Sequence, residues 1–415
     1  MKVGVIGLGY VGLPLAVAFA EAGHEVVGVD VDAAKLTSLQ HGTSYIEDVP
    51  DSAIAEHASA CTWTSDYSEL SAADAVVIAV PTPLTPNREP DLGALVASAS
   101  ALAGVLREGQ LVVLESTTYP GTTRERLVPL LEESGLKAGT DFLVAFSPER
   151  IDPGRTDFTM RTTPKVVGGD GPEAAARAKA LYEQVCDTVI EVSTPDAAEM
   201  TKLLENIYRA VNIALVNEMA VICDRMGIDV WEVVEAAATK PYGFASFKPG
   251  PGLGGHCLPV DPFYLSWKAR EYGVSAEFVE LAGRTNQNMP RIAVERTIEA
   301  LNRNGVATSN AEIAILGVSY KPDVGDLRES PALSIMEQLQ DLGATLSYHD
   351  SHIETLPAFG LKSEPLGDVI SRADLTVIVT AHSSVDYAEV VAGAKQVMDF
   401  RGVTRGIESG DVVRL

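Results

Sequence analysis

One cysteine of this chain lies in a setting that could make it a covalent nucleophile. Cys257 belongs to the glycine-rich stretch PGPGLGGHCLPVDP, which runs from Pro249 to Pro262. Asp261 follows four residues later and places a carboxylate within reach of the thiol. A thiol that adds to a carbonyl carbon splits one difficult step into two easier ones. The stretch therefore predicts covalent chemistry at Cys257.

The other cysteines and the histidines are less informative. Cys61, Cys186 and Cys223 lie in apolar or helical contexts and are expected to be small core side chains. With four cysteines and no C-x-x-C pair, neither a disulfide framework nor a structural zinc site is expected. His349 and His352 flank Asp350, but a loop at the end of a strand explains them equally well, and we predict no metal.

Two polar residues share one face of a long helical segment. Lys202 and Asn206 are one helical turn apart, away from the main apolar stripe. Such a pair can donate hydrogen bonds to an oxyanion that forms on a substrate. The alternative is an ordinary solvated polar face, and the choice depends on whether Cys257 lies nearby.

Three loops follow apolar strands, where ligands of parallel sheets bind. They carry Pro81 and Thr82, then Thr117 and Thr118, and then Glu149 with Arg150. Each loop could be turn chemistry alone. When a cleft closes over a carboxylate, the group is shielded from water and its pKa rises. Glu149 is therefore a candidate general base.

The chain begins with MKVGVIGLGYVGLPLA, a short strand that runs into a glycine-rich turn and a helix. This pattern is typical of a dinucleotide-binding fold, with the pyrophosphate at the helix N-terminus. Asp30 ends the next strand and is placed to bond a ribose hydroxyl, which favours NAD over NADP, although Lys35 lies a turn later. The cofactor-binding residues expected here are Gly7, Gly9, Tyr10, Val11, Gly12, Asp30 and Lys35.

Composition narrows the class of protein. The chain has 415 residues, 46% of them hydrophobic, and a formal net charge of -25. This charge argues against binding along a nucleic acid, and no apolar run approaches the length of a membrane span. We expect a cytoplasmic protein without a signal peptide.

Strand and helix patterns predict an α/β fold with two doubly wound Rossmann-like domains joined by a long central helix. We expect an NAD-binding domain over residues 1–195, a helical dimerisation domain over 196–305 and a second ligand-binding domain over 306–415. The segment after Asp196 has helical periodicity up to Gly227, long enough to join two domains and to offer a face to a second subunit.

The motifs together resemble one family. GLGYVGLPLA, ESTTYPGTT, FSPERIDPG, KLLENIYRAVNIALVNE, GPGLGGHCLPVDP, GVSYKPDVGDLRESP and DFRG occur in the order typical of the UDP-glucose/GDP-mannose dehydrogenase family. The resemblance implies a homodimer that oxidises the C6 alcohol of a nucleotide sugar to a carboxylate, with two NAD reduced. It also implies an N-terminal NAD domain and a C-terminal nucleotide-sugar domain.

The resemblance also implies roles for individual residues. Cys257 would form a thiohemiacetal and then a thioester, while Lys202 and Asn206 stabilise the oxyanions. Asp261 and Thr118 would activate water, and Glu149 would be the base in thioester hydrolysis. The substrate-binding residues implied are Glu149, Arg150, Lys202, Asn206, Gly254, Lys321 and Arg401, and Arg328 would approach the cofactor together with Pro81, Thr82 and Thr117.

The sugar is the open question. ATKPYGF and PGPGLGGHCLPVDPFYLSWKARE look most like the branch that acts on UDP-N-acetylhexosamines, in particular UDP-N-acetylglucosamine, and Val260 stands where the glucose type often has a lysine. UDP-glucose or dTDP-glucose is the alternative. A two-electron β-hydroxyacid dehydrogenase would need neither Cys257 nor a second nucleotide domain, and an NAD-binding sensor would need no reactive thiol at all.

Overall fold

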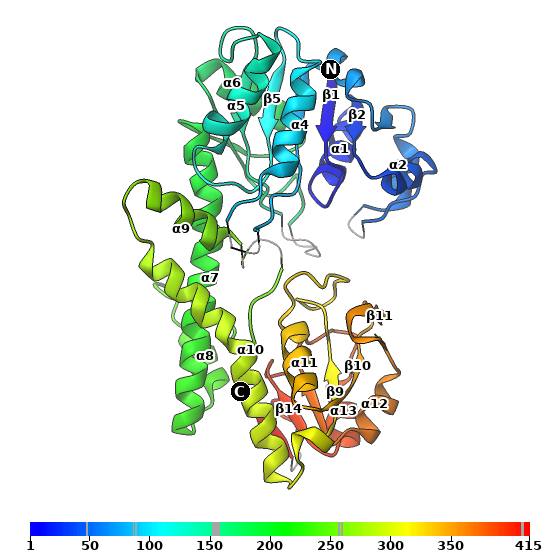
Figure 1. The fold of residues 1–415 in the computed structure, drawn as a ribbon, viewed down its shortest axis with the longest axis vertical. Coiled ribbons are helices and arrows are strands. Elements are labelled where there is room, and N and C mark those ends of the chain that lie inside the picture. Colours follow the sequence, from blue (N-terminus) through cyan, green and yellow to red (C-terminus); the bar gives the residue numbers. More distant parts are fainter. Residues whose placement is uncertain are drawn as a thin grey trace. The chain divides into compact units, whose positions relative to one another are not determined.

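The chain divides into two compact units, each built on its own sheet (Figure 1). The computed structural model describes residues 1–46, 49–85, 87, 89–151, 158–255, 258, 260–407 and 411–415. Unit 1 contains Met1–Glu205 and Phe263–Val274, and unit 2 contains Asn206–Pro262 and Ser275–Leu415. The finer division into three domains expected from the sequence stays a prediction.

Unit 1 contains an eight-stranded sheet in the order β3-β2-β1-β4-β5-β6-β7-β8. Neighbouring strands are parallel except β6 and β7, which pair antiparallel, so the sheet is mixed where the sequence suggested a parallel one. The strands are β1 (Lys2–Ile6), β2 (Glu25–Val29), β3 (Cys61–Thr64), β4 (Ala75–Ile78), β5 (Leu111–Leu114), β6 (Leu143–Phe146), β7 (Lys165–Gly169) and β8 (Val189–Val192).

Helices cover both faces of this sheet. Val3 and Val5 of β1 belong to the core beneath α1 (Gly12–Glu21) and α6 (Pro172–Tyr182), whereas Ile6 packs in the core beneath α4 (Gly93–Ala103) and α5 (Val128–Leu131). Apolar residues on both faces explain why the strands are almost uniformly hydrophobic. The shorter helices α2 (Ala33–Gln40) and α3 (Asp51–Glu56) follow β2.

Unit 2 contains a second, five-stranded parallel sheet in the order β10-β9-β13-β14-β15. Its strands are β9 (Glu312–Leu316), β10 (Thr345–His349), β13 (Leu375–Ile378), β14 (Val397–Asp399) and β15 (Val412–Arg414), and β11 (Thr355–Leu356) pairs with β12 (Leu361–Lys362) apart from it. The helices α11 (Pro331–Asp341), α12 (Leu366–Arg372) and α13 (Tyr387–Gly393) cover its faces. The second Rossmann-like domain expected from the sequence is therefore confirmed.

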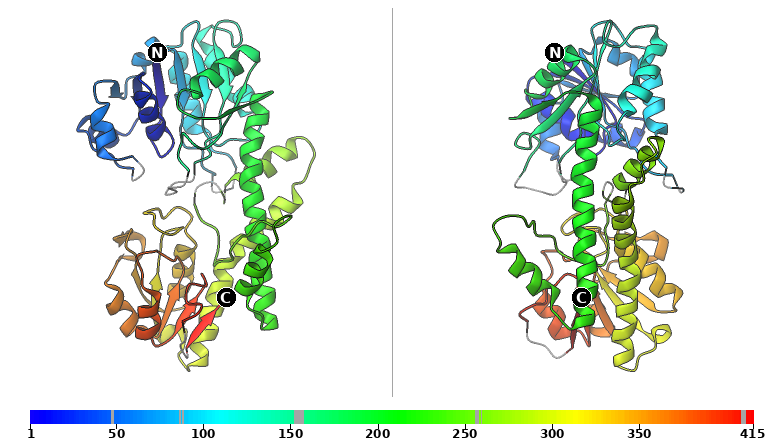
Figure 2. Two further views of the ribbon diagram at one scale, coloured as in Figure 1. Left: turned by 180° about the vertical axis from the view of Figure 1, so that it is seen from behind. Right: turned by 90° about the vertical axis from the view of Figure 1, so that its left-hand side faces the viewer.

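The remaining helices lie between the two sheets in the sequence. They are α7 (Pro195–Met226), α8 (Val230–Ala238), α9 (Asp261–Glu271) and α10 (Glu277–Arg303). Figure 2 shows α7 as one continuous helix, which confirms the long central helix. Among the described residues, none of the helices is both long and apolar enough to cross a membrane.

Both sheets use a glycine at the same topological position. Gly7 follows β1 with φ +90°, and Gly317 follows β9 with φ +76°. A Cβ at Gly7 would lie 2.4 Å from the carbonyl oxygen of Ala79 after β4, and one at Gly317 would lie 2.0 Å from that of Thr380 after β13. At both points the first strand-to-helix turn therefore requires glycine, both for its backbone angle and for its packing.

The variant Gly317→Ala should strongly destabilise unit 2, because the new methyl group would meet backbone that cannot move aside. We expect a loss of more than about 3 kcal/mol in the free energy of unfolding. Gly360→Ala is the matched control, since Gly360 also has positive φ (+67°) but, in the described part of the chain, no atom within 4 Å of the Cβ position. The control should lose only about 1–2 kcal/mol. Equal losses in urea denaturation would contradict the packing argument.

Candidate active site

The glycine turn of unit 1 is shaped to receive a phosphate. A Cβ at Gly12 would lie 1.8 Å from the carbonyl oxygen of Gly7, so the turn packs closely, whereas a Cβ at Gly9 would meet no atom of the described residues within 4 Å. Helix α1 begins at Gly12 with no side-chain cap and no acidic residue in its first turn. The N-terminal end of α1, beside Gly9, can therefore attract an anion.

Asp30 holds this turn in place from the end of β2. Its Oδ2 accepts the N–H of Leu8 at 2.8 Å, its Oδ1 accepts the N–H of Asp32 at 2.9 Å, and Lys35 Nζ lies 3.3 Å from Oδ2. A carboxylate oxygen can accept more than one hydrogen bond, so ribose hydroxyls can still be bound here. The turn, the helix end and Asp30 together fit a dinucleotide.

Hydrogen bonds join the loop after β4 to the loop after β5. Thr82 Oγ1 donates to the carbonyl of Thr117 at 2.6 Å, and Ser116 Oγ donates to that of Val80 at 2.7 Å. Tyr264 of α9 donates to the Thr82 carbonyl at 2.8 Å. Among the described residues, the buried hydroxyl of Thr118 has no hydrogen-bond partner. A buried hydroxyl in this state is suited to bind a water molecule or a substrate group.

Glu149 lies in a buried ionic cluster that the sequence did not reveal. Lys165 Nζ contacts both Glu115 and Glu149, with Glu149 Oε2 at 3.0 Å, and Tyr182 donates its hydroxyl to Glu115. Burial alone would raise the pKa of Glu149, but Lys165 and the N–H of Ile151 outweigh it and lower the pKa to about 2. The rise in pKa expected for Glu149 is therefore wrong, because its counter-ion comes from a distant strand.

The pKa values of Glu115 and Lys165, which share this cluster with Glu149, are also shifted. Burial raises the pKa of Glu115 to about 7, against the opposing charge of Lys165. Burial lowers the pKa of Lys165, but the two carboxylates prevail and raise it above its usual range. The one available signal in the sequence was that Glu115 and Lys165 are charged residues adjoining strongly apolar strands, where buried charges are normally paired.

Arg150 is engaged within unit 1. Its NH2 lies 2.7 Å from Glu205 Oε1, its NH1 donates to the Pro164 carbonyl at 2.5 Å, and its N–H donates to Glu149 at 2.7 Å. The guanidinium thus supports the loop that carries Glu149. A substrate contact of Arg150 stays a prediction.

Asn206 contacts the carboxylate that follows the cysteine stretch. Its Nδ2 donates to Asp261 Oδ2, and both side chains are buried. Lys202, one turn earlier on α7, is half-buried and has no ion-pair partner among the described residues. The face that carries Lys202 and Asn206 is therefore no plain solvated surface.

The first part of the cysteine stretch is held from several sides within unit 2. Asn217 Oδ1 of α7 accepts the N–H of Gly250 at 2.9 Å, and a Cβ at Gly250 would lie 2.6 Å from Arg401 NH1. At Gly252 a Cβ would lie 2.8 Å from Pro331 Cβ and 3.2 Å from Pro290 Cγ. Only glycine lets the loop pass so close to α10 and α11.

Gly254 and Gly255 of this stretch pack on the loop that carries Lys321. A Cβ at Gly254 would lie 2.7 Å from Tyr320 Cβ, and the N–H of Gly255 donates to the Arg328 carbonyl at 3.0 Å. Lys321 Nζ lies 5.8 Å from the ring centre of Tyr320. Cys257, two residues beyond Gly255, lies outside the described residues.

Two substrate- or cofactor-binding candidates in unit 2 have clear protein partners. Arg401 Nε donates to the Val379 carbonyl at 2.5 Å, and burial lowers its pKa to about 10, so it remains charged at neutral pH. Arg328 forms a fork-like pair with Asp326, with NH2 2.6 Å from Oδ2. Both roles stay predictions.

The other cysteines are poor nucleophiles or buried. Burial raises the pKa of Cys61 and of Cys186 to about 11, and Cys223 is buried in the core of unit 2. All three are free thiols. Their placement agrees with the expectation of small core side chains.

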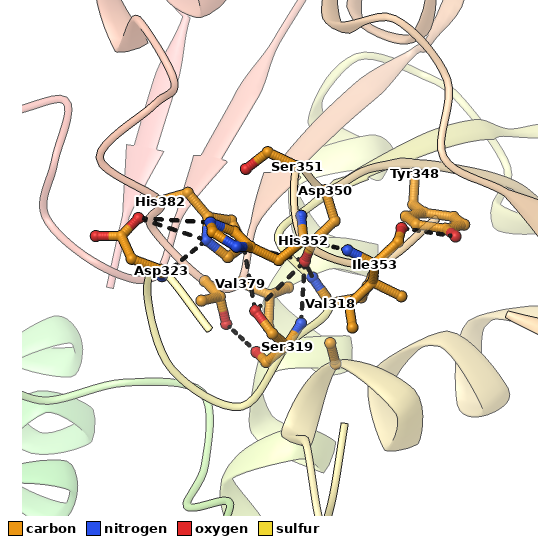
Figure 3. Close-up of polar contacts among 12 residues, drawn as sticks. Val318, Ser319, Asp323, Tyr348, Asp350, Ser351, His352, Ile353, Val379 and His382 are labelled. Carbon is orange, nitrogen blue, oxygen red and sulfur yellow. Dashed lines mark hydrogen bonds and ion pairs between the residues drawn. The ribbon is translucent and has the colours of Figure 1, made fainter. Parts of the chain in front are cut away.

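A polar cluster lies where β9, β10 and β13 end (Figure 3). Asp323, His352 and His382 approach one another closely enough to suggest a metal site. However, His382 Nδ1 accepts the N–H of Asp323 at 3.0 Å, and His382 Nε2 lies 3.0 Å from Asp350 Oδ2. Both ring nitrogens face protein partners, so a metal would have to displace one of them.

The variant Lys165→Met should destabilise unit 1 by about 3–5 kcal/mol, because it leaves two buried carboxylates without their cation. Lys137→Met is the control, since it removes an exposed pair with Glu132 that contributes less than about 0.5 kcal/mol. Chemical denaturation at neutral pH measures both losses. Equal stability of the two variants would show that the cluster has no structural importance.

Acid should weaken unit 2 through Asp350. Burial raises its pKa, but His382 and the N–H of His352 prevail and lower it to about 2, below the value of about 3.9 in an unfolded chain. Ionised Asp350 therefore stabilises the fold above pH 4, and this contribution of about 2 kcal/mol is lost as pH falls toward 2. The stability gap between wild type and Asp350→Asn should shrink over this range in urea denaturation. A gap independent of pH would contradict the assignment.

Comparisons with known proteins agree with this geometry. Residues 1–186 match the NAD-binding domain of the UDP-glucose/GDP-mannose dehydrogenase family, residues 196–288 its central domain, and residues 314–406 its UDP-binding domain. These three matches cover most of the chain.

Relatives that are named for different sugars have similar sequence identity to this chain. The chain is 35% identical to a UDP-N-acetyl-D-glucosamine 6-dehydrogenase of Pseudomonas aeruginosa (92% of this chain and 91% of that protein). It is 36% identical to an NDP-N-acetyl-D-galactosaminuronic acid dehydrogenase of Ralstonia nicotianae (92% and 90%). A solved UDP-D-ManNAc dehydrogenase from Pyrococcus horikoshii superposes with a TM-score of 0.92 at 34% identity, over 100% of this chain and 99% of that one.

The NAD domain contains the glycine turn and Asp30, and the UDP-binding domain contains Lys321 and Arg401. The chain thus belongs to the UDP-glucose/GDP-mannose dehydrogenase family and is an NAD-dependent nucleotide-sugar dehydrogenase.

Proposed function

We propose that this enzyme oxidises the C6 alcohol of UDP-N-acetylglucosamine to the carboxylate in two steps through a covalent adduct on Cys257. The contact between Asn206 and Asp261 carries the proposal. Asp261 follows Cys257 by four residues, so this contact supports a cysteine close to the face of α7 that bears Lys202 and Asn206.

The chain's own residues account for the chemistry as follows. Bound NAD supplies the acceptor for the hydride that C6 loses in each oxidation. The Cys257 thiolate adds to the C6 aldehyde and forms a C–S bond, and the ammonium of Lys202 and the amide of Asn206 stabilise the resulting oxyanion. Loss of a second hydride leaves a thioester, and attack by water breaks the C–S bond and releases the acid and the thiolate.

Three side chains, Thr118, Asp261 and Glu149, would act in the hydrolysis of the thioester. Thr118 offers a buried hydroxyl without a partner among the described residues, which suits a water molecule. Asp261 would accept the proton of that water. Glu149 is held ionised by Lys165, so its role is to orient water by accepting a hydrogen bond rather than to store a proton.

The choice of sugar rests on the sequence motifs and on the names of the relatives. The three relatives above are named for N-acetylated sugars or their uronic acids. This supports a 2-acetamido sugar, and the branch motifs favour the gluco configuration. UDP-glucose is the alternative.

The decisive experiment measures NADH formed per mole of limiting sugar. UDP-N-acetylglucosamine, UDP-N-acetylmannosamine, UDP-N-acetylgalactosamine, UDP-glucose and dTDP-glucose are supplied separately. We expect two NADH per sugar with UDP-N-acetylglucosamine and little with the others. Two NADH with another sugar would overturn the substrate, and one NADH per sugar would overturn the four-electron reaction.

Cys257→Ser should bind NAD normally but lose net acid production, because a serine hydroxyl is a much weaker nucleophile than a thiolate. Cys223→Ser serves as the control for replacing a buried thiol and should keep turnover in the folded fraction. Full acid production by Cys257→Ser, measured by separation of the products, would exclude the covalent route.

We also propose that the enzyme is a homodimer that uses α7. The exposed apolar residues of α7 from Tyr208 onward follow helical spacing: Tyr208, Leu215, Met219, Ile222 and Met226. A row of this kind on one helix face favours a protein partner, and a second copy of the chain is the simplest one.

Leu215→Glu combined with Met219→Glu should give a monomer in light scattering after size-exclusion chromatography, since charge would replace the apolar contact. Leu342→Glu changes a similarly exposed leucine directly after α11 and should leave the mass unchanged. A dimeric double variant would place the interface elsewhere. The cytoplasmic location stays a prediction, which cell fractionation can check.

A further inference from the structure

We infer that His382, in the tautomer fixed by Asp350, is a positioning residue for the loop that carries Lys321, and thereby for binding of the UDP moiety. The inference rests on the proposed function, and within it on the substrate-binding role that the family resemblance implies for Lys321. It concerns three residues to which neither the sequence motifs nor the comparisons assign a role: Asp323, Asp350 and His382.

The first step is that Asp350 fixes the start of the loop. Its Oδ2 accepts the N–H groups of Val318 at 2.7 Å and of Ser319 at 3.1 Å, and its Oδ1 accepts those of His352 and Ile353. Asp350 is 3% exposed, so these bonds lie away from water. One buried carboxylate therefore binds the backbone of the turn that follows β9 (Figure 3).

The second step is that the contacts of His382 assign its tautomer. Nδ1 accepts a hydrogen bond from the backbone N–H of Asp323, so Nδ1 carries no proton. The proton is then on Nε2, which donates to Asp350 Oδ2 at 3.0 Å and lies 3.2 Å from Ser319 Oγ. One imidazole therefore links the two ends of the segment from Ser319 to Asp323.

The third step is that this segment is strained and needs the link. Asp323 has φ +60°, a left-handed conformation that few side chains adopt. Its N–H is held by His382, and its Oδ1 accepts the N–H of Ser383 at 2.8 Å. Both restraints come from the loop after β13, so that loop keeps Asp323 in its unusual conformation.

The fourth step connects the segment to ligand binding. Between its fixed ends, the Ser319 carbonyl accepts from Thr380 Oγ1 at 2.7 Å, and the Lys321 carbonyl accepts from Ser319 Oγ at 3.2 Å. The backbone on both sides of Lys321 is thus bound to the protein, which restrains the point from which its side chain extends. A pre-positioned cation binds a diphosphate more tightly than one that must be ordered on binding.

Two substitutions of His382 separate its two hydrogen bonds. In His382→Asn the amide oxygen takes the place of Nδ1 and can still accept the N–H of Asp323. In His382→Gln the amide nitrogen takes the place of Nε2 and can still donate to Asp350, but the acceptor for Asp323 is lost. The variants are otherwise similar in polarity, so each is a control for the other.

The dissociation constant of UDP is measured by calorimetry, and kcat and KM are measured with the preferred sugar nucleotide and with NAD. We expect His382→Gln to raise the UDP dissociation constant and the sugar KM by about tenfold to a hundredfold. The kcat at saturating sugar and the KM for NAD should stay within about threefold, and His382→Asn should recover most of the UDP affinity. Asp323→Ala should also raise the UDP dissociation constant, because it removes the bond to Ser383 and leaves a β-carbon at a left-handed backbone angle.

Three results would overturn the inference. Unchanged UDP binding in His382→Gln would show that the loop needs no such restraint. Parallel losses of kcat, NAD binding and thermal stability in both His382 variants would show a merely structural histidine. Binding of Zn²⁺ to the wild type that is lost in Asp323→Asn, together with loss of UDP binding after chelation, would show a metal site instead. Because UDP carries no sugar, calorimetry still decides the question if UDP-N-acetylglucosamine proves not to be the substrate.

Discussion

A buried aspartate that accepts backbone N–H groups holds the ligand-facing edge of each sheet. In unit 1 it is Asp30, which accepts the N–H of Leu8, and in unit 2 it is Asp350, which accepts that of Val318. Each ends the second strand of its sheet and fixes the turn after the first strand. A turn without such an acceptor would leave buried donors unpaired, which is unfavourable. The two aspartates thus fix the first strand-to-helix turn of each sheet.

The two sheets differ in the side chain that lies beside this aspartate. In unit 1 a partly exposed lysine, Lys35, lies beside the buried carboxylate of Asp30. In unit 2 the buried imidazole of His382 occupies the corresponding space beside Asp350. The same kind of buried aspartate is thus paired with a partly exposed lysine in the first sheet and with a buried imidazole in the second.

The sequence predicted what depends on local pattern. Strand and helix periodicity identified both sheets and α7, and the strand-turn-helix context of Gly7 identified the cofactor edge. It missed what depends on residues far apart in the chain. Lys165 reaches Glu149 because β7 runs antiparallel beside β6, a pairing with no signature in either strand. Likewise His382 lies 63 residues from Ser319, and only the fold brings the two together.

The glycines before Cys257 have a consequence for how the protein acquires activity. Gly250 is held by Asn217 from α7, and Gly252 fits against Pro290 of α10 and Pro331 of α11. These supports are distant in the sequence, and contacts between distant segments form late because closing long loops is entropically unfavourable. The loop through Gly250 and Gly252 is therefore completed only after the surrounding helices have docked. During synthesis, the nascent chain cannot build this loop until α11 has emerged from the ribosome.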